Sequence, residues 1–158
     1  ILSGNVNYTE IAEEQKTENN YEDATQKSIK FILASLLYKK DYANYNFDLL
    51  PYLKNDSFVK LYNLMKQKNA NNEQIKVSML YDEFDVDSEP NIVDIIDYNF
   101  GENGNNEQYY NACIERLQED GIKDQLAELT QKFKSSADSA ERKKIAIKIS
   151  ELTKKLKK

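Results

Sequence analysis

The C-terminal part of the sequence carries two apolar stripes with identical spacing. Both step by four, three and four residues, which keeps their members on one face of an α-helix. The stripes comprise Ile122, Leu126, Leu129 and Phe133, and then Ile145, Ile149, Leu152 and Leu156. A short polar link, "KSSAD", lies between them. The pattern predicts an antiparallel helical hairpin over residues 121–158, with these eight residues forming a coiled-coil seam.

Residues at the ends of the two predicted helices agree with a hairpin. Asp138 and Glu141 have capping-box spacing, so we expect the second helix to begin beside them. Lysines fill the last turns of that helix, where positive charge interacts favourably with the helix dipole. Gly121 precedes the first stripe. We expect it to act as a hinge between the hairpin and the preceding part of the chain.

Composition and periodicity indicate helices in the rest of the chain. Four Gly and two Pro in 158 residues leave little turn chemistry for a many-stranded β fold. Residues 21–120 contain five or six short helical patterns, which must pack together to be stable in water. The expected fold is therefore all-α, a compact multi-helix bundle followed by the hairpin. Residues 1–20 lack sustained periodicity, and we expect a disordered linker or arm there.

The periodicity also assigns an inner face to each short helix. The residues expected inside are Ile29, Ile32, Leu33, Leu36 and Leu37; Phe58, Leu61, Tyr62 and Met65; Ile75, Met79 and Leu80; Ile92, Val93, Ile95 and Ile96; and Tyr109, Tyr110, Cys113, Ile114 and Leu117. Asp56 and Ser88 are expected to cap two of these helices. We expect Pro51 to interrupt a short helical turn.

The residue types that most catalytic sites need are missing. The chain has no His and one Cys, which excludes Ser–His and Cys–His pairs, most zinc sites and an internal disulfide. Asp85, Asp87 and Glu89 alternate like an EF-hand loop, but Pro90 stands where such a loop needs Gly. We expect a solvated loop there. We therefore expect no enzyme activity, no metal and no cofactor.

The sequence also indicates where the protein is located. A single Cys fits a reducing compartment, so we expect a cytoplasmic protein. No apolar run reaches membrane-spanning length, so we expect no membrane partner. The chain begins with Ile1 rather than Met, and we expect it to be a fragment of a longer protein.

Charge is distributed unevenly along the chain. Residues 122–158 hold ten Lys and one Arg against five acidic residues, a net charge of +6, within a chain of net charge -5. Ile147 lies on the helix face opposite the second stripe, where a hairpin offers nothing to pack against it. Ile147 is therefore either an ordinary exposed isoleucine or part of a docking surface for a partner protein. Two alternatives stay open, direct nucleic-acid binding by the lysines and homodimerisation through the coiled-coil stripe.

The order of these elements resembles the C-terminal domain of bacterial replicative DNA primase. In the tail, the resemblance rests on Leu126 and Leu129, a short link, and the ending with Glu151, Leu152 and Leu156. Nearer the start, "IKFILASLLYKKDY" and "NDSFVKLYNLM" resemble helices of that family's bundle. The likeness spans roughly residues 22–158. The zinc-binding and polymerase domains of such a primase would lie upstream.

The resemblance implies a partner and a role. It implies a non-catalytic domain that docks on the N-terminal domains of the hexameric replicative helicase and couples priming to unwinding at the replication fork. The hairpin would then be the docking element. The residues expected to contact the helicase are Lys143, Lys144, Ile147, Lys148, Glu151, Lys154, Lys155 and Lys158.

Overall fold

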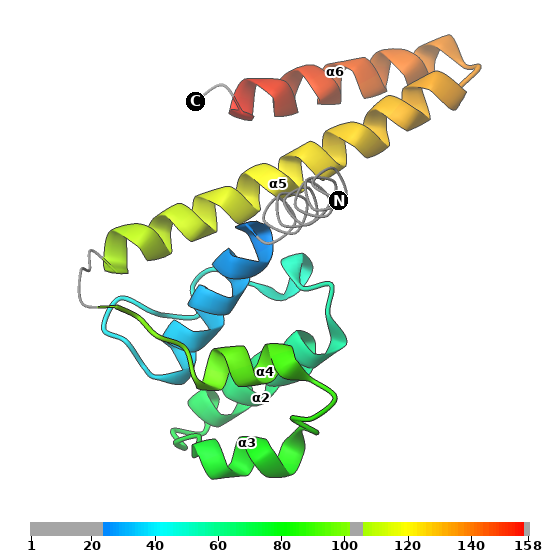
Figure 1. The fold of residues 1–158 in the computed structure, drawn as a ribbon. Coiled ribbons are helices and arrows are strands. Elements are labelled where there is room, and N and C mark those ends of the chain that lie inside the picture. Colours follow the sequence, from blue (N-terminus) through cyan, green and yellow to red (C-terminus); the bar gives the residue numbers. More distant parts are fainter. Residues whose placement is uncertain (1–23, 102–105, 157–158) are drawn as a thin grey trace, which may run out of the picture. The chain divides into compact units, whose positions relative to one another are not determined.

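Helices make up all of the regular secondary structure in the computed structural model (Figure 1), which describes residues 24–101 and 106–156. No strand occurs within those two ranges, and the all-α prediction is confirmed. The chain divides into two compact units, Ile1–Cys113 and Ile114–Lys158. We call them the bundle unit and the hairpin unit. The division lies within one helix, before the boundary at residues 120 and 121 that we expected. The expected arm, residues 1–20, lies outside the described residues.

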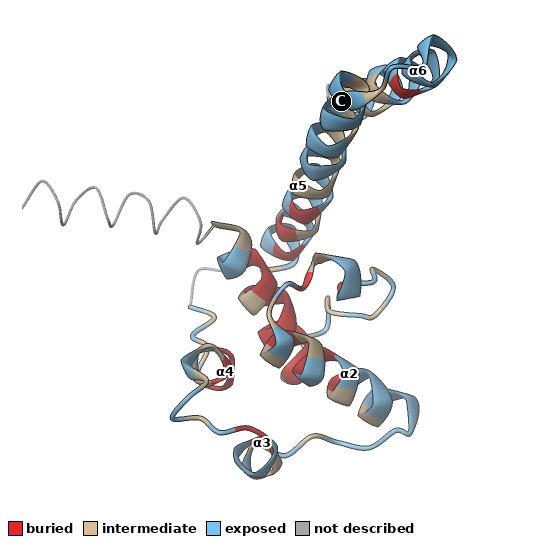
Figure 2. Cartoon of the chain, turned by 90° about the vertical axis from the view of Figure 1, so that its right-hand side faces the viewer, coloured by how far each residue is buried: buried red, intermediate tan, exposed pale blue. Residues whose placement is uncertain are grey.

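The helix over residues 24–37 forms the centre of the bundle unit. All five of its predicted inner residues are buried, and so are Phe31, Ala34 and Ser35. A helix that is apolar on nearly every side is stable only when other elements surround it. Its two buried hydroxyls are satisfied, because Ser28 donates to the Ala24 carbonyl at 3.0 Å and Ser35 hydrogen-bonds the Tyr42 hydroxyl at 3.2 Å. Figure 2 shows the buried residues concentrated on this helix and on the elements that cover it.

A short 3₁₀ helix, η1 (Leu50–Tyr52), follows a loop and carries Pro51 near its start. Proline is tolerated in a first turn, where its missing N–H leaves no hydrogen bond unmade. The expectation that Pro51 interrupts this turn was therefore wrong. Leu49 and Leu53 flank η1 and are buried. The Leu49 backbone N–H donates to the Tyr62 hydroxyl at 3.2 Å, which ties η1 to the next helix.

Helix α2 (Asp56–Ala70) buries all four of its predicted inner residues. Its N-cap is Asn55, whose side-chain oxygen accepts from the N–H groups of Ser57 and Phe58. Asp56 is the first helical residue, so the prediction that it caps α2 was wrong by one position. Asn55 has the extended backbone that a cap requires, with φ −99° and ψ 125°. Asp56 still adds negative charge at the positive end of the helix dipole.

Helices α3 (Val77–Glu83) and α4 (Pro90–Ile96) follow in the bundle unit and have one or two turns each. Leu80 is fully buried, while Ile75 and Met79 are half-buried. In α4, Ile92, Ile95 and Ile96 are buried and Val93 is half-buried.

The predicted cap of α4 was wrong. The helix begins at Pro90, and Glu89 occupies the cap position without a side-chain cap hydrogen bond. Ser88 lies one residue too early to cap, and its hydroxyl donates instead to the Asp85 carbonyl at 3.2 Å. The acidic segment between α3 and α4 is a loop with a turn at its centre, as the sequence predicted.

Helix α5 (Asn106–Ser135) is a single helix of 30 residues. Tyr110, Cys113 and Leu117 are buried as predicted, and Ile114 is half-buried. Tyr109 was also expected inside but is 46% exposed. The helix runs through Gly121 without a break. One glycine costs about 1 kcal/mol in a helix interior, which is too little to end a helix held at both ends. A hinge at Gly121 stays a prediction.

Helix α6 (Ser139–Leu156) packs against the C-terminal half of α5, which confirms the predicted hairpin (Figure 1). Ile145 is 8% exposed and the other seven seam residues are half-buried. Asp138 caps α6 by accepting from the Ala140 N–H at 3.1 Å. Glu141 accepts from the Ser136 hydroxyl at 3.4 Å, across the turn of the hairpin. None of the described helices is long and apolar enough to span a membrane.

Candidate protein-docking face

The side of α6 that points away from the seam gathers seven of the residues expected to contact a partner. At 3.6 residues per turn, these seven lie within about 100° of Ile147 around the helix. We call this surface the α6 outer face; it comprises Lys143, Lys144, Ile147, Lys148, Glu151, Lys154 and Lys155. All seven side chains are exposed. Lys158, the eighth predicted residue, lies outside the described residues.

Ile147 is the unusual member of the α6 outer face. Its side chain is 60% exposed, more than that of any other large hydrophobic residue in the described ranges. Within residues 114–156 it is the only large hydrophobic side chain that is exposed. The seam residues next to it in sequence, Ile145 and Ile149, are buried and half-buried. Ile147 therefore contributes little to hairpin packing.

Five lysines surround Ile147 on the α6 outer face. Lys143, Lys144, Lys148, Lys154 and Lys155 have no carboxylate within ion-pair distance among the described residues. Two bundle lysines differ, because Lys30 pairs with Asp94 at 2.8 Å and Lys68 with Glu73 at 2.7 Å. Glu151 is the single acid of the α6 outer face. The face thus presents five cations and one anion around one aliphatic side chain.

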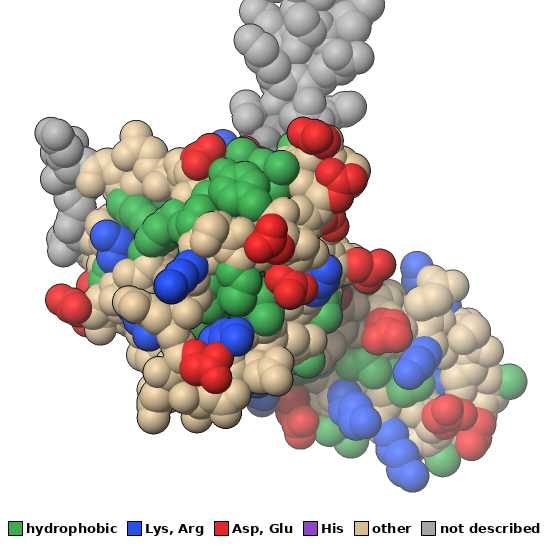
Figure 3. All heavy atoms as spheres, turned by 90° about the horizontal axis from the view of Figure 1, so that it is seen from below, with side chains coloured by type: hydrophobic (Ala, Val, Ile, Leu, Met, Phe, Trp, Pro, Cys, Tyr) green, Lys and Arg blue, Asp and Glu red, His purple; other side chains and the backbone are tan. Residues whose placement is uncertain are grey.

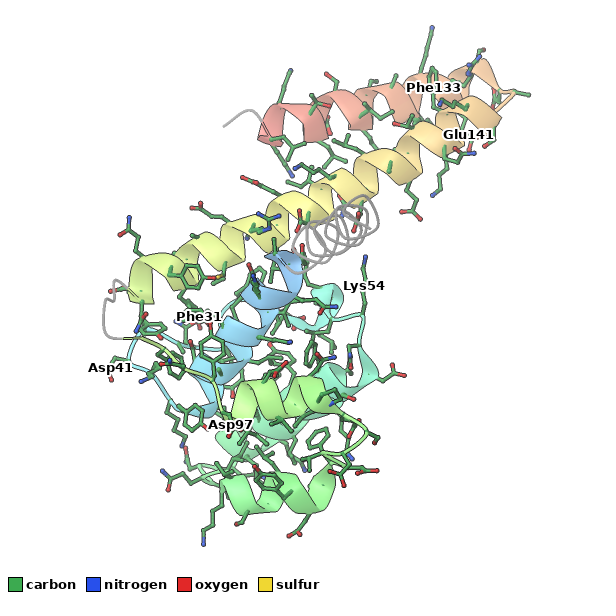
Figure 4. All side chains as sticks on the ribbon, viewed as in Figure 1. Phe31, Asp41, Lys54, Asp97, Phe133 and Glu141 are labelled. Atoms are coloured by element: carbon green, nitrogen blue, oxygen red, sulfur yellow. The ribbon has the colours of Figure 1, made fainter. Side chains whose placement is uncertain are left out.

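Contacts at the turn and along the seam hold α6 in place. The Arg142 guanidinium carbon lies 4.6 Å from the centre of the Phe133 ring, a cation–π contact that joins α6 to α5 beside the turn (Figure 4). Ile145, one turn further on, is the most buried residue of the seam. Because the seam faces α5, the α6 outer face is turned to solvent by the fold of the hairpin itself.

A second exposed surface, which the sequence did not predict, lies on the bundle unit. Three of the five exposed large hydrophobics in the described ranges are tyrosines of this surface, Tyr38 at 40%, Tyr81 at 47% and Tyr109 at 46%. Two half-buried rings complete it. We call this surface the aromatic ridge; it comprises Tyr38, Tyr81, Tyr98, Phe100 and Tyr109.

Ring contacts connect the ridge to the core. The Tyr109 ring meets the buried Phe31 ring edge to face, with 4.6 Å between their centres. Phe100 lies 5.9 Å from Phe31, 5.0 Å from Tyr98 and 6.1 Å from Tyr38. Figure 4 labels Phe31 among these side chains. Eleven Tyr and six Phe were a compositional signal, but the five ridge residues come from four separate segments, and only the fold brings them together.

Two tyrosines of the ridge, Tyr38 and Tyr109, have raised pKa values. Burial, followed by the charge of Asp97, raises the pKa of Tyr38, and its hydroxyl donates to the Ile96 carbonyl. Burial and the Cys113 side chain raise the pKa of Tyr109 to about 12. At neutral pH both side chains therefore present an uncharged ring with a polar hydroxyl.

The acidic segment shows no arrangement suited to a metal. Among the described residues, no group of three or more His, Cys, Asp or Glu side chains is placed to hold an ion. Glu89 instead accepts a hydrogen bond from the Ser57 hydroxyl, which ties the α3–α4 loop to α2.

Comparison of the chain with protein-family models, with curated proteins and with solved structures found no match. Its role must therefore be argued from the two exposed surfaces and from the resemblance of its sequence.

Proposed function

We propose that this chain is a non-catalytic protein-docking domain, and that its α6 outer face binds an acidic surface of a partner. Following the resemblance to the primase C-terminal domain, the proposed partner is the N-terminal domain of a hexameric replicative helicase. The observation that carries the proposal is the 60% exposure of Ile147 among five lysines that have no carboxylate partner in the described ranges.

The lysines and Ile147 of the α6 outer face contribute to binding in different ways. Exposed lysines attract an acidic surface over several ångströms and mainly raise the association rate. Ile147 supplies apolar area that is removed from water only in the complex. Burying the rest of its side chain contributes about 1–2 kcal/mol, or roughly a tenfold change in affinity.

Direct nucleic-acid binding is the alternative that the lysines favour. Phosphate contacts need cations alone, so binding of this kind gains nothing from an isoleucine at the centre of the face. Single-stranded nucleic acid also stacks on aromatic side chains, and the hairpin's one aromatic residue, Phe133, is half-buried in the seam. Ile147 and the lysines together fit a protein surface better than a phosphate backbone.

The test compares two variants that add the same charge to the same hairpin. Ile147→Asp places a carboxylate at the centre of the α6 outer face, and Ala127→Asp places one at an exposed position of α5. Calorimetric titration of the cognate helicase N-terminal domain should show at least about tenfold weaker binding for Ile147→Asp. Ala127→Asp should bind within about twofold of the unchanged chain, because it lies off the face.

Two results would count against the proposal. Equal affinities for Ile147→Asp and Ala127→Asp would remove the α6 outer face as the docking site. Single-stranded DNA binding that falls steeply with salt and is insensitive to Ile147→Asp, without any helicase binding, would favour the nucleic-acid alternative.

A further inference from the structure

The aromatic ridge has the composition of a binding surface rather than of ordinary exposed chain. Exposed aromatic side chains are concentrated at protein interfaces, where tyrosine buries a large ring for little loss of conformational freedom. Tyr38 directly follows the helix over residues 24–37 and Tyr81 lies in α3, and Tyr81 is close enough to contribute to the raised pKa of Tyr38. Contiguous apolar surface of this kind on a soluble domain marks a site that another molecule covers.

The charges beside the ridge indicate that it accepts cations. The Lys40 ammonium already lies 4.4 Å from the centre of the Phe100 ring, so the ridge accommodates a lysine over an aromatic face. Asp97 is the charged group that acts most strongly on Tyr38. Figure 3 shows one face of the bundle unit, on which hydrophobic side chains lie beside both acidic and basic ones. An occupant with lysines around an aliphatic anchor fits this combination.

This chain itself carries such an occupant. The α6 outer face presents Ile147 at its centre and five lysines without carboxylate partners among the described residues. The two units are also opposite in charge. Among the described residues, those of Ile1–Cys113 hold nine Lys against twelve acidic residues, a net charge of −3, whereas those of Ile114–Lys158 hold ten basic against eight acidic residues, a net charge of +2.

We infer that the aromatic ridge of one copy binds the α6 outer face of a second copy. The interface is heterologous, because it joins two different surfaces, so each bound pair leaves one ridge and one α6 outer face free for further copies. Lysine ammonium groups lie over tyrosine rings and near Asp97, and Ile147 packs between rings. Association therefore grows with protein concentration and weakens with salt.

This inference goes beyond the proposed function, because it assigns a partner to the aromatic ridge. Both use the α6 outer face, so a copy bound through that face to another copy is not available to the helicase. The ridge itself takes no part in helicase docking. A ridge variant therefore affects self-association alone and separates the two ideas.

The experiment uses one variant for each surface. Tyr81→Lys places a cation on the ridge at an exposed side chain, and Ile147→Asp places an acid on the α6 outer face. Sedimentation velocity at low salt, across the accessible concentration range, should show that the unchanged chain associates and that each variant alone is monomeric. An equimolar mixture of the two variants should form a heterodimer and nothing larger. In that pair, the intact ridge of Ile147→Asp binds the intact α6 outer face of Tyr81→Lys.

Two control variants change exposed residues outside both surfaces. Leu50→Lys changes an exposed hydrophobic of the bundle unit outside the ridge, and Ala127→Asp changes α5; both should associate like the unchanged chain. Circular dichroism should show the same helix content in every variant. A monomeric unchanged chain at all concentrations, a Tyr81→Lys variant that still associates, or a mixture that stays monomeric would each overturn the inference. Helicase binding retained by Tyr81→Lys and lost by Ile147→Asp leaves the proposed function in place in any of these cases.

Discussion

The bundle unit and the hairpin unit bury their apolar side chains to very different extents. In the bundle unit, Leu33, Leu49, Leu61 and Leu80 are completely inaccessible to solvent. In the described part of the hairpin, residues 122–156, Ile145 alone is buried and the rest of the seam is half-buried. Two helices can cover only one stripe of each other, whereas several helices around a central one can enclose it.

This difference separates two uses of apolar residues in one small protein. The bundle unit places most of them in a closed core, and that core fixes the rings of the aromatic ridge. The hairpin unit places eight in a thin seam and leaves Ile147 outside it. The hairpin unit, which has the smaller core, therefore leaves a larger share of its side chains exposed than the bundle unit does.

The largest effect should come from the core of the bundle unit. Leu61 is fully buried in α2, so Leu61→Ala removes buried area and leaves a cavity, at a cost of about 2–5 kcal/mol in the free energy of unfolding. Urea unfolding followed by circular dichroism measures the loss. Leu50→Ala, at a side chain 38% exposed in the same unit, is the control and should stay within about 0.5 kcal/mol. Similar losses for the two variants would contradict a closed core.

A smaller effect should come from the seam. Ile149 is half-buried, so Ile149→Ala loses less apolar contact and leaves no enclosed cavity, and we expect about 1–2 kcal/mol. Amide hydrogen exchange should accelerate in α6 and the facing part of α5, with little change in α2. Ile147→Ala should alter exchange at neither helix. If Ile147→Ala destabilised α6 as much as Ile149→Ala does, the assignment of seam and outer face would be incorrect.

The smallest effect appears only at alkaline pH, and it should be confined to the bundle unit. Burial raises the pKa of Tyr45 to about 12 in the folded chain, from an ordinary value of 10.0. Between these values the unfolded chain loses the proton first, so stability is intact below pH 10 and falls as the pH rises toward 12. Tyr45→Phe should reduce that fall.

The measurement for Tyr45 is urea unfolding at several pH values. The two proteins should show the same pH dependence below pH 10, where this tyrosine is neutral in both states. A Tyr45→Phe variant whose stability falls as steeply as that of the unchanged chain above pH 10 would show that burial of this hydroxyl has no energetic consequence.

Features that depend on local spacing could be predicted from the sequence. The helix over residues 24–37, the inner face of α2 and the whole hairpin seam follow from apolar residues at three- and four-residue steps. The members of the α6 outer face follow from the same geometry. The continuity of α5 through Gly121 could not be predicted from the sequence. The cost of one glycine in a helix must be compared with the stabilisation from tertiary contacts, and the sequence does not show those contacts.

Features that depend on the exact start of a helix or on distant segments were missed. Asn55 and Asp56 are both good capping residues, and only the backbone conformation selects Asn55. Tyr109 has the right periodicity for the core but is 46% exposed, because its ring packs on Phe31 from outside. The aromatic ridge needs residues 38, 81, 98, 100 and 109 to meet, and no local pattern encodes that meeting.

The position of Ile147 outside the seam has an evolutionary consequence. A substitution in a seam residue changes both hairpin stability and the placement of α6, so such positions are free to vary only together. Ile147 and its neighbouring lysines lie outside that constraint, and their replacement leaves the fold intact. The docking proposed for this face can therefore change in strength and in partner one residue at a time, without compensating changes elsewhere in the chain.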